Sequence, residues 1–216
     1  MLLGFHHRDY YHCAYAMNQY LASNGYVVLS VNYLSGTGYG LKFREVLNYG
    51  AGGNSGFNDV LGAGLFLQNH PNVEATKIGL WGGSYGRYLI AMGLVRASDM
   101  FAAGVDIHGV MNWHVIIKNF MPSYEALEHP YFAKLAYDSS PIAHMDTWCS
   151  PVLLIHGDDD RNVPFSESVD KIKALREEKV YYEQLVFPDE VHGFLLHQSW
   201  IDAYKATVDF FERMLD

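Results

Sequence analysis

The stretch Ile78–Leu89, IGLWGGSYGRYL, places one serine between glycines directly after an apolar run. Gly82, Ser84 and Gly86 fit the G-x-S-x-G pattern, in which a sharp strand-to-helix turn lifts the serine hydroxyl above a sheet. A serine hydroxyl is a weak nucleophile near neutral pH, so this pattern carries chemistry only when a histidine base and an orienting carboxylate accompany it. Alone, the pentapeptide is also compatible with a plain structural turn.

Candidates for both partners follow later in the chain, each at the end of a strand-like run. The run Pro151–His156 leads into the acidic residues 158–160, and Val180–Phe187 leads into a loop that holds His192. The order serine, aspartate, histidine is the one that a sheet with a G-x-S-x-G turn requires. The sequence therefore predicts acyl transfer through a Ser-His-Asp triad.

These residues need a scaffold in which several strands end at the same edge. Short, β-branched runs predict strands buried on both faces, at Tyr26–Tyr33, Lys77–Trp81, Ala103–Ile107, Pro151–His156 and Val180–Phe187. Segments with helical spacing alternate with them, at Tyr11–Ser23, Phe57–Asn69, Tyr85–Ala97, Phe165–Glu178 and Ser199–Met214. The alternation predicts an α/β fold, a mostly parallel sheet with helices on both faces. Met111–Trp148 is less regular and is interpreted as an insertion beside the site.

Composition limits the possible partners. The 216 residues are half hydrophobic, which suits one domain over residues 1–216. Lys and Arg number 15 against 24 Asp and Glu, and no basic run is present, which argues against nucleic acid. We also expect no membrane span, no signal peptide and hence a cytoplasmic protein. Cys13 and Cys149 are expected to be reduced thiols.

The chain resembles the catalytic domain of the prolyl oligopeptidase family of serine peptidases. The resemblance covers nearly the whole sequence and is carried by the motifs VNYLSGTGYG, NDV, GLWGGSYGRYL, LLIHGDDDRNVPF and DEVHGF. It implies an α/β-hydrolase fold with Ser84 as nucleophile, His192 as base and Asp160 as the orienting acid. The position of the aspartate relative to Pro164 selects Asp160 over Asp158 and Asp159, which we interpret as a solvated acidic turn.

The resemblance also suggests further site residues. The backbone N–H of Tyr85 is expected to be one oxyanion donor. Residues that would contact the substrate are Val110, Trp113, Ile116, Phe120 and Asn162; core packing is the alternative for the first four, and a turn role for the last. His6, His7 and His12 lack a completing ligand pattern, so no metal is expected, and no cofactor is implied.

Three features depart from the family pattern. Arg87 stands where relatives usually have a second glycine, and Leu34 where they usually have arginine, so a charge pair is expected to be missing. The third is the segment MLLGFHH, which we place after the central H-G-G-P strand, so that the fold is truncated at its N-terminus. A missing central strand would expose strand edges and favour a homo-oligomer, most simply a dimer.

Two functions are consistent with this pattern. The first is a serine hydrolase that cleaves acyl esters, or short peptide or aminoacyl amides, through an acyl-enzyme. The alternative is a catalytically impaired remnant of the same fold that serves as a self-associating interaction module.

Overall fold

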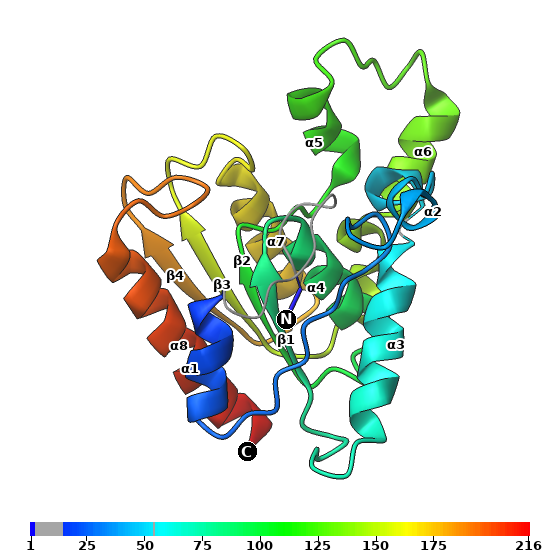
Figure 1. Ribbon diagram of the computed structural model, residues 1–216. Coiled ribbons are helices and arrows are strands. Elements are labelled where there is room, and N and C mark those ends of the chain that lie inside the picture. The colour runs from blue at the N-terminus through cyan, green and yellow to red at the C-terminus, as the bar shows by residue number, and fades with distance from the viewer. Residues whose placement is uncertain (3–14, 54) are drawn as a thin grey trace.

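The computed structural model describes residues 1–2, 15–53 and 55–216, and a parallel sheet runs through its centre (Figure 1). The sheet has four strands in the order β1-β2-β3-β4, and every neighbouring pair is parallel. Their bounds are β1 Gly79–Gly83, β2 Ala103–Ile107, β3 Val152–Gly157 and β4 Tyr182–Phe187. Four of the five predicted strands are thus present, and the predicted α/β class is confirmed.

Helices cover both faces of this sheet (Figure 1). A side chain at Gly79 would meet Phe211 of α8, whereas the next residue of β1, Leu80, packs against Gly93 of α4. Successive strand residues point to opposite faces, so α8 and α4 lie on opposite sides of the sheet. The helices are α1 Ala16–Ser23, α2 Leu41–Arg44, α3 Gly56–Gln68, α4 Tyr85–Arg96, α5 Trp113–Phe120, α6 Pro130–Asp138, α7 Ser166–Glu177 and α8 His197–Leu215, with 3-10 turns η1 Gly50–Gly52 and η2 Pro141–Thr147.

Burial of the strands follows their place in the sheet. All residues of β2 and β3 are buried, as the continuous apolar runs predict for strands covered on both faces. The edge strand β4 alternates between half-buried and exposed residues, so the prediction of burial on both faces is wrong for this run. The most buried helix is α4, in which every residue from Tyr85 to Val95 is buried. The helix that follows Ser84 is therefore fixed on all sides by packing.

The predicted strand Tyr26–Tyr33 is not a regular strand. Within it, only Val31 forms a β-bridge, to Leu2, and Leu2 also bridges Gly82 at the edge of β1; both bridges are parallel. A strand needs a continuous partner, and Leu2 supplies one residue of pairing. The sequence predicts that the segment MLLGFHH lies wholly after the central strand. This expectation is wrong for its first two residues, since Leu2 lies between Val31 and Gly82, at the place of a central strand. Residues 3–14, including the start of the predicted helix Tyr11–Ser23, the histidines 6, 7 and 12, and Cys13, lie outside the described residues.

The region between β2 and β3 extends beyond the carboxyl edge of the sheet (Figure 1). It holds α5, α6 and η2, and Ile117, Tyr124 and Ala133 build a small apolar cluster of its own. Its beginning is tied to α7, because the carboxylate of Glu167 accepts hydrogen bonds from the backbone of Met111 and Asn112 at 2.8 and 3.2 Å. The predicted insertion is thus anchored to α7. Among the described residues, no helix has the length and apolar character to cross a membrane.

A buried ion pair joins α7 to the middle of the sheet. Lys171 and Asp106 are 1 % and 2 % exposed, and the Nζ of Lys171 donates to the carboxylate of Asp106. Removing one partner would leave an uncompensated charge in the core.

We expect Lys171→Met to lower the free energy of unfolding by about 3–5 kcal/mol, because Asp106 would lose its counter-ion while staying buried. Urea denaturation measures this change. Lys173→Met is the matched control, since it breaks the exposed Lys173–Asp170 pair of the same helix and should cost less than about 1 kcal/mol. Equal effects of the two substitutions would show that the buried pair does not stabilise the fold.

Candidate active site

Ser84 occupies the turn between β1 and α4. Its φ of 51° and ψ of −116° lie outside the regions that L-residues commonly adopt. The end of β1 also lies close to a second backbone segment, because a side chain at Gly82 would lie 2.3 Å from the carbonyl oxygen of Leu2. Such strain costs about 1–3 kcal/mol and persists only where packing on both sides enforces it. Here β1 and the buried α4 hold the hydroxyl at the carboxyl edge of the sheet.

His192 and Asp160 meet Ser84 at this edge. The Nε2 of His192 lies 2.9 Å from the Oγ of Ser84, and its Nδ1 lies 2.7 Å from the Oδ2 of Asp160. The carboxylate accepts from Nδ1–H, so Nε2 is the unprotonated nitrogen that can accept the serine proton. The structure therefore brings the three predicted residues together in one line of hydrogen bonds.

The carboxylate of Asp160 is buried and surrounded by donors. Its Oδ1 accepts the backbone N–H groups of Asn162 and Val163 at 2.9 and 3.0 Å, while its Oδ2 faces His192 and, at 3.2 Å, the Nε2 of His156. Burial alone would raise the pKa of Asp160, but the hydrogen bonds from His156, His192 and Val163 outweigh it and hold the pKa well below its ordinary range. Asp160 is therefore an anion at any pH near neutrality.

His156 contacts the carboxylate of Asp160 through its ring nitrogen Nε2. Its Nε2 faces two acceptors, Asp160 Oδ2 and the carbonyl oxygen of Val163 at 3.1 Å, so this nitrogen carries the proton. Its Nδ1 then accepts from the hydroxyl of Ser168 at 2.6 Å. The ligand atoms of His108, His156 and Asp160 lie within 4.8 Å of one another, a spacing that could hold a metal ion. The donors and acceptors around His156 and Asp160 account for this cluster as a hydrogen-bond network.

His108 and Arg87 complete the floor of the site. Burial, followed by the charge of Arg87, lowers the pKa of His108, so its ring stays neutral; its centroid lies 5.1 Å from that of His192. Arg87 is 2 % exposed, and its Nε donates to the carbonyl oxygen of Gly82 at 2.8 Å. Burial lowers the pKa of Arg87, and the charges of Asp106 and Asp160 oppose that effect. The arginine thus projects under the Ser84 turn toward the neighbouring strand.

The five predicted substrate residues are not among those that line the cleft at Ser84. Val110 and Ile116 are buried, whereas Phe120 is 61 % exposed at the end of α5. Trp113 packs edge-on against Tyr88 with ring centroids 5.2 Å apart, and the exposed Asn162 uses its backbone N–H to cap Asp160. The cleft beside the nucleophile has a volume of about 330 Å³, and its lining includes Ser84, His192, Arg87, Trp200 and Tyr204 but none of these five residues.

His108 directly follows β2 and His156 lies near the end of β3, but local sequence does not reveal that both histidines converge on Asp160. That convergence depends on the register of β2 against β3, in which Ile107 pairs with Ile155. Leu34, the second unusual position, donates its backbone N–H to the carboxylate of Asp59 at 2.7 Å. At this position a backbone N–H, and not an arginine side chain, thus contacts the carboxylate.

Comparison with known proteins gives one consistent family. Residues 12–216 match the prolyl oligopeptidase family. The dipeptidyl aminopeptidase BIII of Pseudoxanthomonas mexicana is 32 % identical over 206 residues, which cover 90 % of this chain and 30 % of that protein.

Solved structures agree with the sequence comparison. The acylaminoacyl peptidase of Pyrococcus horikoshii superposes with a TM-score of 0.86 at 26 % identity, over 99 % of this chain and 36 % of that one. A puromycin-hydrolyzing peptidase of Mycobacterium tuberculosis gives 0.85 at 25 % identity, over 99 % and 33 %. The fold is therefore the α/β-hydrolase fold of such catalytic domains. The chain spans about a third of the length of these proteins.

The low pKa of Asp160 predicts an acid-dependent loss of stability. Because the pKa is lower in the folded than in the unfolded chain, the ionised carboxylate stabilises the fold fully above the unfolded pKa of about 4. This contribution decreases progressively as the pH falls from there toward the lower folded pKa. The stability difference between wild type and Asp160→Asn, measured by urea denaturation, should shrink between pH 5 and pH 2.5. Asp159→Asn, at an exposed pair with Arg161, should show little difference throughout. A wild type to Asp160→Asn difference that does not change with pH contradicts this assignment.

Proposed function

Because the chain belongs to the prolyl oligopeptidase family, we propose that residues 1–216 form a catalytic domain that hydrolyses acyl esters and short peptide or aminoacyl amides. Ser84 is the nucleophile, His192 the general base and Asp160 the orienting acid. The observation that carries the proposal is the continuous hydrogen-bond line from Ser84 through His192 to a buried anion. It is the arrangement that acyl transfer by a serine requires.

The first half of the reaction forms an acyl-enzyme. As the Oγ of Ser84 bonds to the acyl carbon, its proton moves to Nε2 of His192, and the carbonyl electron pair moves onto the substrate oxygen. The imidazolium is stabilised by the carboxylate of Asp160 2.7 Å from Nδ1. When the tetrahedral intermediate collapses, the bond to the leaving alcohol or amine breaks, and that group takes the proton from Nε2.

The second half regenerates the enzyme. A water molecule gives one proton to Nε2 of His192 while its oxygen bonds to the acyl carbon. The second tetrahedral intermediate then releases Ser84, which recovers the proton from Nε2, and the product leaves as a carboxylic acid. The anionic state of Asp160, maintained by its donors, serves both halves.

The start of α4 supports charge stabilisation at the substrate oxygen. Tyr85 is the first residue of this helix, and its backbone N–H belongs to a helix terminus whose dipole favours negative charge. We assign it one contact to the oxyanion. Removing one oxyanion contact typically lowers turnover about 100- to 1000-fold, so we expect the N–H of Tyr85 to contribute to the rate on that order.

The nature of the substrate is inferred from the relatives and from the apolar elements at the site. The relatives are named as dipeptidyl and acylaminoacyl peptidases, which supports a short peptide or blocked aminoacyl substrate. None of the five predicted substrate residues lines the cleft beside Ser84, so they would contact a substrate only where it extends beyond that cleft. Ester cleavage follows from the same mechanism, since an ester carbonyl lacks the amide resonance and is attacked more readily by the serine oxygen.

An impaired, self-associating module is the second candidate. Its support is that, among the described residues, Leu2 alone forms β-bridges to both Val31 and Gly82. The homodimer and the cytoplasmic location remain predictions.

We expect Asp160→Asn to lower kcat about 10⁴-fold on short acyl esters and aminoacyl amides, because the asparagine amide would favour the wrong tautomer of His192. Initial rates with p-nitrophenyl esters and aminoacyl p-nitroanilides measure this. Ser84→Ala should abolish hydrolysis above the level left by binding, and Asp159→Asn should retain wild-type rates. Comparable losses in Asp159→Asn and Asp160→Asn would show that the orienting acid is misassigned, and an inactive wild type would favour the second candidate.

A further inference from the structure

The carboxylate of Glu190 is buried two residues before His192, and no step of the proposed reaction uses it. The residue is 2 % exposed, and an acidic side chain is almost never buried without partners. Burial alone would raise the pKa of Glu190, but hydrogen bonds from Ser199 and from backbone N–H groups outweigh it and lower the pKa. Glu190 is therefore a second buried anion, in addition to Asp160.

Three partners of this carboxylate lie at the start of α8. Its Oε2 accepts the backbone N–H of Leu195 at 2.6 Å. Its Oε1 accepts the backbone N–H of Leu196 at 3.0 Å and the hydroxyl of Ser199 at 2.6 Å. Leu196 caps α8, and the backbone N–H groups at a helix start have no acceptor within the helix. Both oxygens of Glu190 are thus used to join the loop of His192 to this helix.

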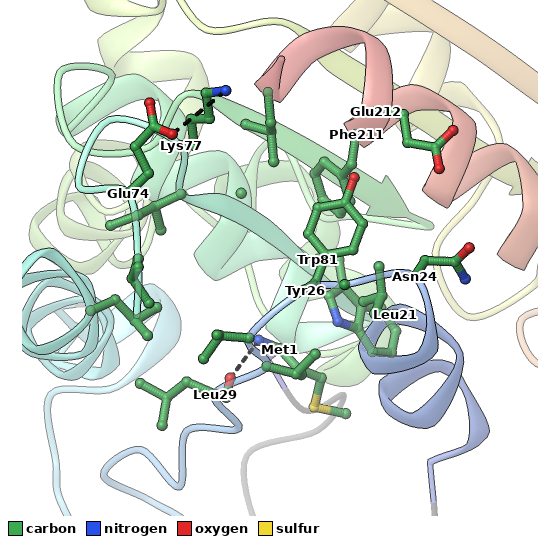
Figure 2. Close-up of a pocket in the computed structure, with 18 of the residues that line it drawn as sticks. Met1, Leu21, Asn24, Tyr26, Leu29, Glu74, Lys77, Trp81, Phe211 and Glu212 are labelled. Atoms are coloured by element: carbon green, nitrogen blue, oxygen red, sulfur yellow. Dashed lines mark hydrogen bonds and ion pairs between the residues drawn. The ribbon is translucent and has the colours of Figure 1, made fainter. Parts of the chain in front are cut away.

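Helix α8 is a fixed support for that loop, because it is packed onto the sheet along its length. Near its far end, Phe211 packs against Gly79 of β1, and its ring centroid lies 6.2 Å from that of Tyr26. Figure 2 shows Phe211 directed from α8 toward Tyr26. A contact to the start of α8 is therefore a contact to the core of the protein. The buried residues of α8 are Ser199, Ala203, Thr207, Val208, Phe210, Phe211 and Leu215.

The main chain of Glu190 contacts the loop that carries Asp160. Its carbonyl oxygen accepts the backbone N–H of Asp159 at 3.1 Å. The two backbones approach so closely that a side chain at Gly157, the last residue of β3, would lie 2.2 Å from the same oxygen. Glu190 therefore joins three parts of the structure, namely the loop of Asp160, the loop of His192 and α8.

The position of His192 depends on these contacts. Residues 188–196 connect β4 to α8, and the carboxylate of Glu190 links a point before His192 to two points after it, at Leu195 and Leu196. The backbone on both sides of the histidine is thereby fixed. This matters for the 2.7 Å contact between His192 and Asp160, because a displacement of about 1 Å can lower turnover on the order of 100-fold.

We propose that Glu190 is a positioning residue whose buried carboxylate holds His192 within hydrogen-bond distance of both Ser84 and Asp160. This role rests on the proposed function, since it acts through the base of that reaction. A carboxylate suits the position because all of its partners at α8 are donors. A neutral amide would present an N–H of its own to one of them.

Glu190→Gln tests the role, because it keeps the size of the side chain and replaces one acceptor by a donor. We expect kcat on p-nitrophenyl esters to fall about 10- to 100-fold and KM to change less than about twofold, since His192 is displaced and substrate binding is not. Asp189→Asn, an exposed substitution in the same loop, should leave kcat unchanged. An unchanged kcat in Glu190→Gln would overturn the proposal.

A double substitution separates positioning of His192 from a general loss of folded protein. In the Asp160→Asn background, Glu190→Gln should lower kcat less than about twofold, because the contact that it serves is already lost. An equal loss in both backgrounds would show that Glu190 acts on the whole fold and would refute the positioning role. Ser199→Ala removes one donor and keeps the carboxylate, so it provides the same test if Glu190→Gln does not fold; its loss of kcat should be smaller and should again disappear in the Asp160→Asn background.

The proton between Nδ1 of His192 and Asp160 gives a readout that needs no hydrolysis. A proton in a short, charge-assisted hydrogen bond resonates at low field in proton NMR, and Asp160→Asn should identify this resonance by removing it. Glu190→Gln should shift or broaden the resonance, whereas Asp189→Asn should leave it in place. A wild type that hydrolyses nothing would refute the proposed function alone. The resonance would then still decide the role of Glu190, and an unchanged resonance in Glu190→Gln would contradict it.

Discussion

The buried carboxylate of Asp160 is the constraint on which the candidate site depends. A lone anion in the core would be costly, so the loop after β3 must supply donors to it. Backbone N–H groups of Asn162 and Val163 serve one oxygen, and imidazoles serve the other. With both oxygens engaged, the carboxylate has a fixed position and charge, and these set the tautomer and orientation of His192. The strained turn at Ser84 then places the serine hydroxyl within hydrogen-bond distance of Nε2 of His192.

The parallel sheet brings these side chains together, because all of its strands end at the same edge. Ser84, His108, Asp160 and His192 follow β1, β2, β3 and β4, four strands that end at one edge. Rigidity comes from the core behind them: α4 is buried along nearly its whole length, and the Lys171–Asp106 pair ties α7 to the strand between β1 and β3. On the other side of β1, Leu2 is the one described residue that forms β-bridges, to Val31 and Gly82. The site thus rests on the four paired strands and on the core behind them.

Much of the site could be predicted because its signals are local. Ser84 is marked by its glycines, Asp160 and His192 by their places after strand-like runs, and the four strands β1–β4 by apolar runs of the right length. Tyr26–Tyr33 carries the same kind of run, yet it forms no regular strand, because strand formation depends on a neighbour that sequence pattern does not describe. Sheet register brings His108 and His156 together at Asp160, and helix packing directs Arg87 under the Ser84 turn. Neither sheet register nor helix packing can be predicted from the local sequence.

The central claim is that the described geometry is a working acyl-transfer site. Labelling with a fluorophosphonate tests it most directly, because the reagent bonds to a serine only when a base removes its proton. Intact-mass spectrometry should show one adduct per chain, peptide mapping should place it on Ser84, and substitution of Asp160 by asparagine should slow its formation. An unlabelled protein that is folded by circular dichroism, or an adduct on another serine, would contradict the account.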